Sequence, residues 1–231
     1  MFVPGSFSKL AAWKPIYANL KQSYRVIETS LCGYGQTSEI RSTGDLAMSH
    51  QFDVLANVTT RAATPLHIVG HSFGATIALI FALENPKNVL SLTLFEPNPL
   101  CFLREDGCFD ALSDIDFMYA AFCKAVAHKN PDPARLMIDL YGGVGFYETL
   151  PELVKRYCHH TLSANLLDWR KAKSYRYDPA QITAFEVPAL LVSGRVKSRM
   201  MRDVTYGLYQ RFERVAQKVL PTAGHFLIRT H

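Results

Sequence analysis

The chain has 231 residues, of which 48% are apolar and 19% are charged, and its formal net charge is +5. This composition is typical of a folded globular protein with a large core, and it excludes a disordered chain. The positive charge is modest and dispersed, and the sequence has neither zinc-finger spacing nor an aromatic-plus-basic signature, which argues against a nucleic-acid partner.

Targeting and redox signals favour a cytoplasmic protein without a membrane partner. The N-terminal residues lack the charged and apolar regions of a signal peptide, and the longest apolar run, residues 77–83, is too short to span a membrane. The five cysteines are odd in number and form no C-x-x-C pair, so we expect reduced thiols. A disulfide within residues 101–158 is the less favoured alternative.

Strands and helices are predicted to alternate over the first hundred residues, because runs of apolar residues switch between strand-like and helical spacing. In chain order the predicted elements are a strand end at 2–3, a helix over 11–22, a strand over 25–28, a helix near 45–60, a strand over 66–69, a helix over 75–85 and a strand over 89–95. This alternation predicts an α/β fold with a doubly wound, mostly parallel sheet.

Residues 98–185 have a different character, because they are aromatic, mostly helical in pattern and broken by prolines and glycines. We predict that they form a helical cap inserted into a core made of residues 1–97 and 186–231. The aromatic residues of this segment either line an apolar pocket or form the core of the cap itself. They include Phe102, Phe117, Tyr119, Phe122, Tyr141, Phe146 and Tyr147.

The most informative motif is Gly70-His71-Ser72-Phe73-Gly74, a G-x-S-x-G pattern between a predicted strand and a predicted helix. In this context the serine occupies a sharp strand-to-helix turn, where larger residues in place of the two glycines would collide. The turn exposes the Ser72 hydroxyl at a helix N-terminus, where developing negative charge is favoured. His71 lies inside the turn, and we interpret it as structural.

Three further segments accompany this motif: residues 24–37, a strand running into a glycine-rich loop; residues 188–194, a buried strand; and residues 219–226, a strand end with a loop histidine. With them, the chain resembles the α/β-hydrolase family over most of residues 1–95 and 185–228. The resemblance implies catalytic residues in the order serine, acid, histidine. It therefore implies Ser72 as the nucleophile and His225 as its base.

The acid is less clear from the sequence. Many family members carry it three residues after the glycine that closes the penultimate strand, but this chain has Lys197 there. We favour Glu96, which ends the predicted strand over 89–95, as some hydrolase-fold enzymes carry their acid at that strand end. Asp203 and Asp178 are weaker candidates, and a site without an acid is a further alternative.

The resemblance also implies an oxyanion hole formed by two backbone N–H groups. Phe73 follows the nucleophile and supplies one, and Ser6 is the candidate for the other, in a loop where Pro4 replaces the family's usual histidine. Among the basic residues, those over 170–176 are interpreted as a solvated helix face. In the stretch 195–199, a solvated loop is favoured over attraction of a substrate carboxylate by Lys197 or Arg199.

Compared with the family, both ends of the chain look short. Family members usually have two more strands before residue 2 and a closing helix after the histidine loop. We therefore expect shortened edge strands and a shortened C-terminal helix, in either a minimal variant or a truncated product. An open sheet edge would favour pairing with a second copy, so a homo-oligomer is expected.

We expect a serine hydrolase that cleaves a carboxylic ester or related acyl bond of a small molecule through an acyl-enzyme. No cofactor is required, and His159 and His160 lack partners at metal-ligand spacing, so no metal is assigned. One alternative is a C–C bond hydrolase that uses the same residues on a diketone-like substrate. Another is a non-catalytic or truncated ligand-binding protein of the same fold.

Overall fold

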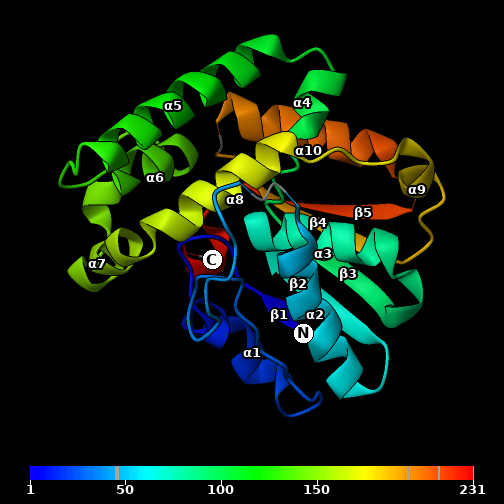
Figure 1. Cartoon of the computed structure of the whole chain (residues 1–231). Helices are drawn as coiled ribbons and strands as arrows, with labels where there is room; N and C mark the ends of the chain where they lie inside the picture. Colours follow the sequence, from blue (N-terminus) through cyan, green and yellow to red (C-terminus); the bar gives the residue numbers. More distant parts are fainter. Residues whose placement is uncertain (45–46, 197, 213, 231) are drawn as a thin grey trace.

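A computed structural model of the chain describes residues 1–44, 47–196, 198–212 and 214–230. Five parallel strands form one sheet in the order β1-β2-β3-β4-β5 (Figure 1). The strands are β1 (Phe2–Val3), β2 (Leu66–His71), β3 (Val89–Phe95), β4 (Ala189–Gly194) and β5 (Val215–Leu220). With helices on both faces of this sheet, the predicted α/β fold is confirmed.

Helices connect the strands and cover the sheet. They are α1 (Lys14–Leu20), α2 (Ser49–Ala62), α3 (Phe73–Glu84), α4 (Cys101–Glu105), α5 (Phe109–Ala127), α6 (Ala134–Gly142), α7 (Glu152–His160), α8 (Leu162–Ser174), α9 (Pro179–Thr183), α10 (Arg199–Arg211) and α11 (Leu227–Thr230). Three short 3₁₀ helices, η1 (Leu10–Trp13), η2 (Pro86–Asn88) and η3 (Tyr147–Thr149), complete the described elements. No helix in the described part of the chain is long and apolar enough to cross a membrane.

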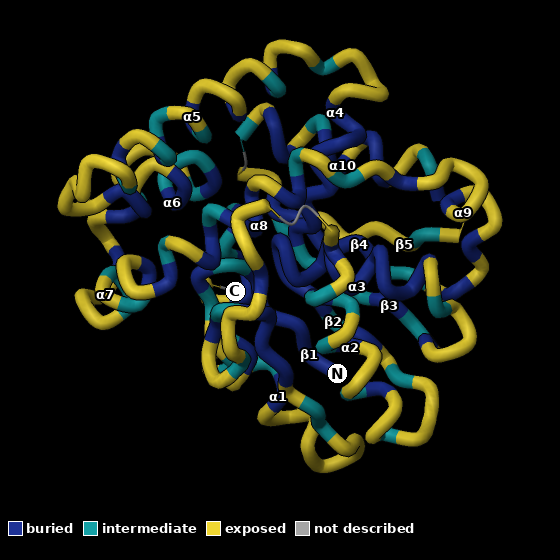
Figure 2. Tube along the Cα trace, in the orientation of Figure 1, coloured by how far each residue is buried: buried dark blue, intermediate teal, exposed yellow. Residues whose placement is uncertain are grey.

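Two hydrophobic clusters pack on opposite faces of the sheet because side chains alternate along each strand. The larger cluster includes α3, whose residues 73–83 are all buried, and the helices between β3 and β4. The smaller cluster packs Trp13 and Tyr17 of η1 and α1 with Leu227 and Ile228 of α11. Figure 2 shows β1 and α3 in the buried interior, whereas β5 at the sheet edge and the outer helices are largely exposed.

The elements before β2 differ in part from the sequence-based prediction. The strand predicted over 25–28 is wrong, since only a single bridge joins Glu28 to Phe2. The helix predicted over 11–22 is divided into η1 and α1, with Pro15 at the start of α1, where its fixed backbone angle is favourable. The helix predicted near 45–60 begins at Ser49, and residue 45 lies outside the described residues.

The chain between β3 and β4 is helical almost throughout, and we call residues 101–183, with helices α4 to α9, the cap segment. In Figure 1 helices α5 to α8 run along one side of the sheet, above the ends of the strands. The boundaries of a separate cap domain at 98 and 185 stay a prediction.

Candidate active site

Ser72 occupies a sharp turn between β2 and α3. Its backbone has a φ of 53° and a ψ of −127°, a conformation that non-glycine residues rarely adopt. A Cβ at Gly70 would lie 2.6 Å from the Ala75 Cα, and one at Gly74 would lie 2.2 Å from the Pro4 carbonyl oxygen. The two glycines are therefore required by the tight packing of the turn.

His225 lies in the loop after β5, and its side chain reaches Ser72. The His225 Nε2 is 2.9 Å from the Ser72 Oγ, and both residues are buried. On the other side of the ring, the His225 Nδ1 is 3.4 Å from Glu96 Oε2. The structure therefore brings together three side chains from the ends of three strands.

Glu96 follows β3 and is fully buried. Its backbone has a positive φ of 47°, which turns the chain sharply after the strand. The Gly194 N–H, at the end of β4, donates a 2.7 Å hydrogen bond to Glu96 Oε1. One carboxylate oxygen is thus held by the neighbouring strand end, and the other faces His225.

The other two candidate acids, Asp178 and Asp203, belong to helices α9 and α10. Asp178 is exposed and caps α9, where it accepts a 2.9 Å hydrogen bond from the Ala180 N–H. Asp203 lies on α10, and over the described residues no hydrogen bond joins either aspartate to His225. Lys197 lies outside the described residues. Arg199 pairs with Asp110 at 3.0 Å in an exposed position, away from the cavity beside Ser72.

The two predicted oxyanion donors lie next to the turn. Phe73 is the first residue of α3, where backbone N–H groups have no partner within the helix. A Cβ at Gly5 would lie 3.0 Å from the Ser72 Cβ, so the loop carrying Ser6 passes directly beside the serine. Both Phe73 and Ser6 line the cavity at Ser72. Their role in binding an oxyanion stays a prediction.

The cavity at Ser72 has a volume of about 70 Å³ and lies between the strand ends and the cap segment. Its walls are mainly apolar, and the polar residues that line it beside Ser72 and His225 include Ser6, Asn98, Asn165, Asp168 and Arg229. Of the seven aromatic residues singled out in the cap segment, Tyr141 lines this cavity, while Phe102 and Phe122 are fully buried in the core. The apolar lining includes Leu100, Met137, Ile138, Leu150, Val154, Trp169, Phe226 and Ile228.

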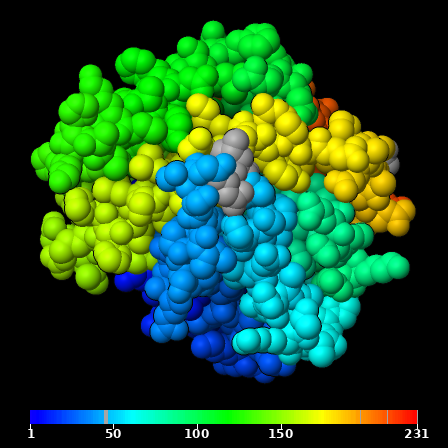
Figure 3. Space-filling view, viewed as in Figure 1, coloured from blue at the N-terminus to red at the C-terminus, as the bar shows by residue number. Residues whose placement is uncertain are grey.

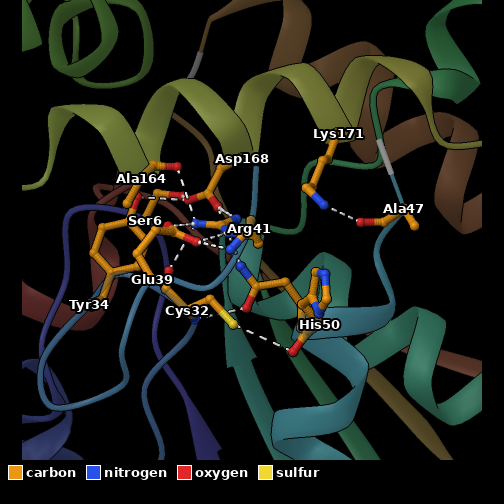
Figure 4. A network of polar contacts seen from close by, with 11 residues as sticks. Ser6, Cys32, Tyr34, Glu39, Arg41, Ala47, His50, Ala164, Asp168 and Lys171 are labelled. Atoms are coloured by element: carbon orange, nitrogen blue, oxygen red, sulfur yellow. Dashed lines mark hydrogen bonds and ion pairs between the residues drawn. The ribbon is translucent and has the colours of Figure 1, made fainter. Parts of the chain in front are cut away.

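A buried carboxylate, Asp168 of α8, connects the cap segment to the loop at Ser6 (Figure 4). Asp168 Oδ2 accepts hydrogen bonds from Ser6 Oγ at 2.5 Å and from the Tyr34 hydroxyl at 2.7 Å. Asp168 Oδ1 accepts one from Arg41 Nη1 at 2.5 Å. Arg41 is also bound by Glu39, at 2.6 Å between its Nη2 and Oε2. Four segments of the chain therefore converge on one ion pair.

Arg41 stays protonated although its side chain is completely buried. Burial alone would lower its pKa, but hydrogen bonds and charges from Glu39 and Asp168 raise the pKa above its ordinary value. The guanidinium also donates to the Cys32 carbonyl at 2.9 Å. A buried charge with this many partners becomes costly as soon as one of them is removed.

We therefore expect Asp168→Ala to lower the free energy of unfolding by about 3–5 kcal/mol, because it leaves Arg41 partly uncompensated in the interior. Urea unfolding followed by circular dichroism measures the change. The matched control is Asp116→Ala, which removes the exposed Asp116–Lys173 pair and should cost about 0–1 kcal/mol. Equal losses in the two variants would contradict the stabilising role of the Asp168 network.

The basic stretch over 170–176 is only partly the predicted solvated face, because Arg170 and Arg176 are exposed but Lys171 is not. Lys171 is fully buried, and its ammonium donates to the Ala47 carbonyl, while Arg170 donates to the Thr43 carbonyl. Figure 3 shows the light-blue segment before α2 lying against the yellow surface of α8, where these contacts form. Hydrogen bonds from Arg170 and Lys171, together with the Asp168–Arg41 ion pair, thus hold helix α8 against the core.

His71 is buried next to Ser72, and its interpretation as a structural residue stays a prediction. Its Nε2 lies 2.8 Å from the His225 carbonyl oxygen, so this nitrogen carries a proton and donates it. The Nδ1 is buried and has no hydrogen-bond partner among the described residues. Burial, together with the neighbouring His225, lowers the pKa of His71 to about 3. The ring is therefore neutral at physiological pH.

The pKa of His71 predicts acid sensitivity. In the unfolded chain its pKa is about 6.5, so below that pH the unfolded state binds a proton that the folded state does not. Stability is therefore complete above about pH 6.5 and falls as the pH drops towards about 3. Between about pH 7 and pH 5 this single group should cost about 2 kcal/mol.

Urea unfolding at a series of pH values measures this dependence. A His71→Gln variant should show a shallower loss of stability on the acid side, even if it is less stable at neutral pH. His67→Gln is the matched control, since the ring of His67 is exposed and contacts Ser91. A His71→Gln profile parallel to that of the parent protein would contradict the assignment.

Sequence reasoning missed Asp168, Asn165, Asn98 and the specific role of Tyr141. Asp168 sits in Leu167-Asp168-Trp169, and an acidic residue inside an otherwise buried helical stretch is the one local signal of its role. The other three are ordinary polar residues of the cap segment and its approach. Only the folded arrangement brings them to the cavity.

Comparison with known proteins agrees with the fold. The family model for the alpha/beta hydrolase fold matches residues 1–231. The chain therefore belongs to the α/β-hydrolase fold family. It is 29% identical over 100 residues to "Abhydrolase domain-containing protein lid-1" of Caenorhabditis elegans. The aligned region covers 42% of this chain and 28% of that protein.

Two further matches illustrate the range of the family. "Probable lysophospholipase BODYGUARD 2" of Arabidopsis thaliana is 30% identical over 103 residues, 42% of this chain and 22% of that protein. The match thus spans less than a third of either curated relative. The 2-hydroxy-6-oxo-6-phenylhexa-2,4-dienoate hydrolase of a Rhodococcus species has a TM-score of 0.72 at 18% identity, over 97% of this chain and 83% of that one, a likeness of fold.

Proposed function

We propose that the protein is a serine hydrolase that cleaves a carboxylic ester, or a related acyl bond, of a small molecule through an acyl-enzyme. The observation that carries the proposal is the alignment of Ser72, His225 and Glu96, with separations of 2.9 Å and 3.4 Å. A serine hydroxyl needs an adjacent base to act as a nucleophile, and the base needs a group that fixes its tautomer. This arrangement meets both requirements.

In the proposed mechanism, His225 takes the Ser72 proton on Nε2 as the Oγ attacks the substrate carbonyl. The His225 Nδ1–H points at Glu96, which stabilises the imidazolium, and the separation shortens as charge develops. The backbone N–H groups of Phe73 and Ser6 hold the oxyanion. His225 then protonates the leaving group, and water hydrolyses the acyl-enzyme by the same path in reverse.

The setting supports a largely apolar acyl substrate. The cavity of about 70 Å³ offers mainly aliphatic and aromatic walls around Ser72. All five cysteines are free thiols, in keeping with the proposed cytoplasmic location. A homo-oligomer stays a prediction from the open sheet edge.

Steady-state and pre-steady-state hydrolysis of p-nitrophenyl acetate tests the proposal. A burst of one p-nitrophenol per active chain, followed by slower turnover, is the expected result for an acyl-enzyme. A fluorophosphonate should abolish turnover and label Ser72, as read by peptide mass spectrometry.

The alternatives have distinct outcomes in the same experiment. Turnover of a vinylogous diketone without ester hydrolysis would favour a C–C bond hydrolase. Neither turnover nor labelling, in a protein that unfolds cooperatively, would overturn the proposed activity and favour a ligand-binding role.

A further inference from the structure

A buried chain of hydrogen bonds leads from α3 to the cavity through Asn98. The Thr76 hydroxyl, one turn after Ser72, lies 2.9 Å from Asn98 Oδ1 and accepts the Asn98 backbone N–H at 3.1 Å. The Asn98 Nδ2 in turn lies 2.7 Å from the Tyr141 hydroxyl of α6. All three residues are buried, so each polar group depends on these partners.

The direction of this chain follows from the Thr76 hydroxyl. Its proton can go to Asn98 Oδ1 at 2.9 Å or to the Ser72 carbonyl at 3.5 Å. Because hydrogen bonds weaken steeply beyond about 3.2 Å, the first acceptor is favoured. Asn98 therefore presents its carbonyl oxygen to Thr76 and its amide N–H to Tyr141.

Tyr141 then receives a hydrogen bond and keeps a proton of its own to donate. Burial raises the pKa of Tyr141 above its ordinary value, and the Asn98 N–H offsets only part of that, so the phenol is protonated at neutral pH. Within the described ranges, no side chain or backbone oxygen accepts the Tyr141 proton. A buried donor left without an acceptor is costly, and the cavity is the remaining place for one.

The Tyr141 ring is fixed next to the reacting groups. It stacks on the His225 imidazole, with 4.2 Å between ring centroids and 19° between planes. Both residues line the cavity together with Ser72. A substrate attacked by Ser72 therefore occupies the cavity that Tyr141 also lines.

We propose that the Tyr141 hydroxyl is a specificity-determining donor, which selects esters with an acceptor oxygen beside the scissile carbonyl, on the acyl or the alcohol side. This inference rests on the proposed hydrolase function and adds a substrate class to it. An acceptor oxygen of the substrate beside the phenol would complete its hydrogen bonding, whereas a methylene at the same place would leave the donor unsatisfied.

Two pairs of nearly isosteric esters test the proposal. On the acyl side, p-nitrophenyl methoxyacetate is compared with p-nitrophenyl butyrate. On the alcohol side, 2-methoxyethyl acetate is compared with butyl acetate. For each pair, the ratio of kcat/KM values is measured in the parent protein and in Tyr141→Phe, so that the intrinsic reactivities of the esters cancel.

In at least one pair, Tyr141→Phe is expected to lower the preference for the oxygen-containing ester by roughly tenfold. The pair that responds shows which side of the substrate the phenol contacts. Tyr147→Phe is the matched control, because the Tyr147 hydroxyl donates to Asp132 at 2.9 Å and Tyr147 does not line the cavity. That variant should keep the parent's ratios.

Unchanged ratios in Tyr141→Phe for both pairs, with ester hydrolysis intact in the parent, would overturn this inference alone. Absence of hydrolysis of all four esters by the parent would instead overturn the proposed function and the inference with it. A general loss of activity from disturbed packing would lower kcat/KM for both members of a pair equally. Such a loss leaves the ratio unchanged and therefore counts against the proposal.

Discussion

Ser72→Ala is expected to lower kcat for ester hydrolysis by about 10⁶, because it removes the hydroxyl that forms the proposed acyl-enzyme. Any remaining turnover would come from the oxyanion donors and from binding of the substrate. The variant should fold normally, since alanine is smaller than serine and the positive φ of this residue is held by the surrounding turn. Stopped-flow release of p-nitrophenol should show no burst.

The matched control for Ser72→Ala is Ser193→Ala. Ser193 is also fully buried, at the end of β4, but its hydroxyl has no hydrogen-bond partner among the described residues and does not line the cavity. This variant should retain the burst and the turnover of the parent. A burst that persists in Ser72→Ala would contradict the assignment of the nucleophile.

Glu96→Gln is expected to lower kcat by about 10⁴ while the protein stays folded. The carbonyl oxygen of the substituted amide side chain would keep the hydrogen bond from the Gly194 N–H, which Glu96 Oε1 accepts at 2.7 Å. The N–H groups of that amide would then face the Nδ1 of His225. This contact favours the tautomer with the proton on Nε2, which cannot accept the proton of Ser72.

A second variant tests the alternative acid, and the pH profile of Glu96→Gln tests the tautomer effect. Asp203→Asn, at the alternative acid position on α10, should leave kcat unchanged. Activity lost in Asp203→Asn but kept in Glu96→Gln would move the acid to α10. A loss in Glu96→Gln that is partly recovered at high pH, where hydroxide replaces the base, would indicate a tautomer effect.

The sequence predicts the features that depend on neighbouring residues. The G-x-S-x-G turn is local, because the two glycines that make it possible lie two residues from Ser72 on each side. The strands predicted over 66–69 and 89–95 correspond to β2 and β3, and the nearly continuous apolar content of the second is typical of a parallel strand. The α/β-hydrolase fold could therefore be predicted from a few short segments.

Features that depend on contacts between distant segments could not be predicted in the same way. Lys171 is one of several basic residues in its stretch, and only the position of α8 against the Ala47 carbonyl buries its ammonium. The stretch over 25–28 has a strand-like composition, but it lies at the sheet edge and pairs only at Glu28. In both cases tertiary packing overrides the local pattern.

The Asp168 network also limits how the fold can be recombined. Asp168 comes from the cap segment, whereas Arg41 and Ser6 come from the first part of the core, 127 and 162 residues away. A chimera that receives the cap segment of a relative without an acidic residue at this place would keep the buried Arg41 guanidinium with Glu39 as a partner but without its second carboxylate. The cap segment is therefore not a freely exchangeable module, and successful transplants should preserve Asp168 or replace Arg41 at the same time.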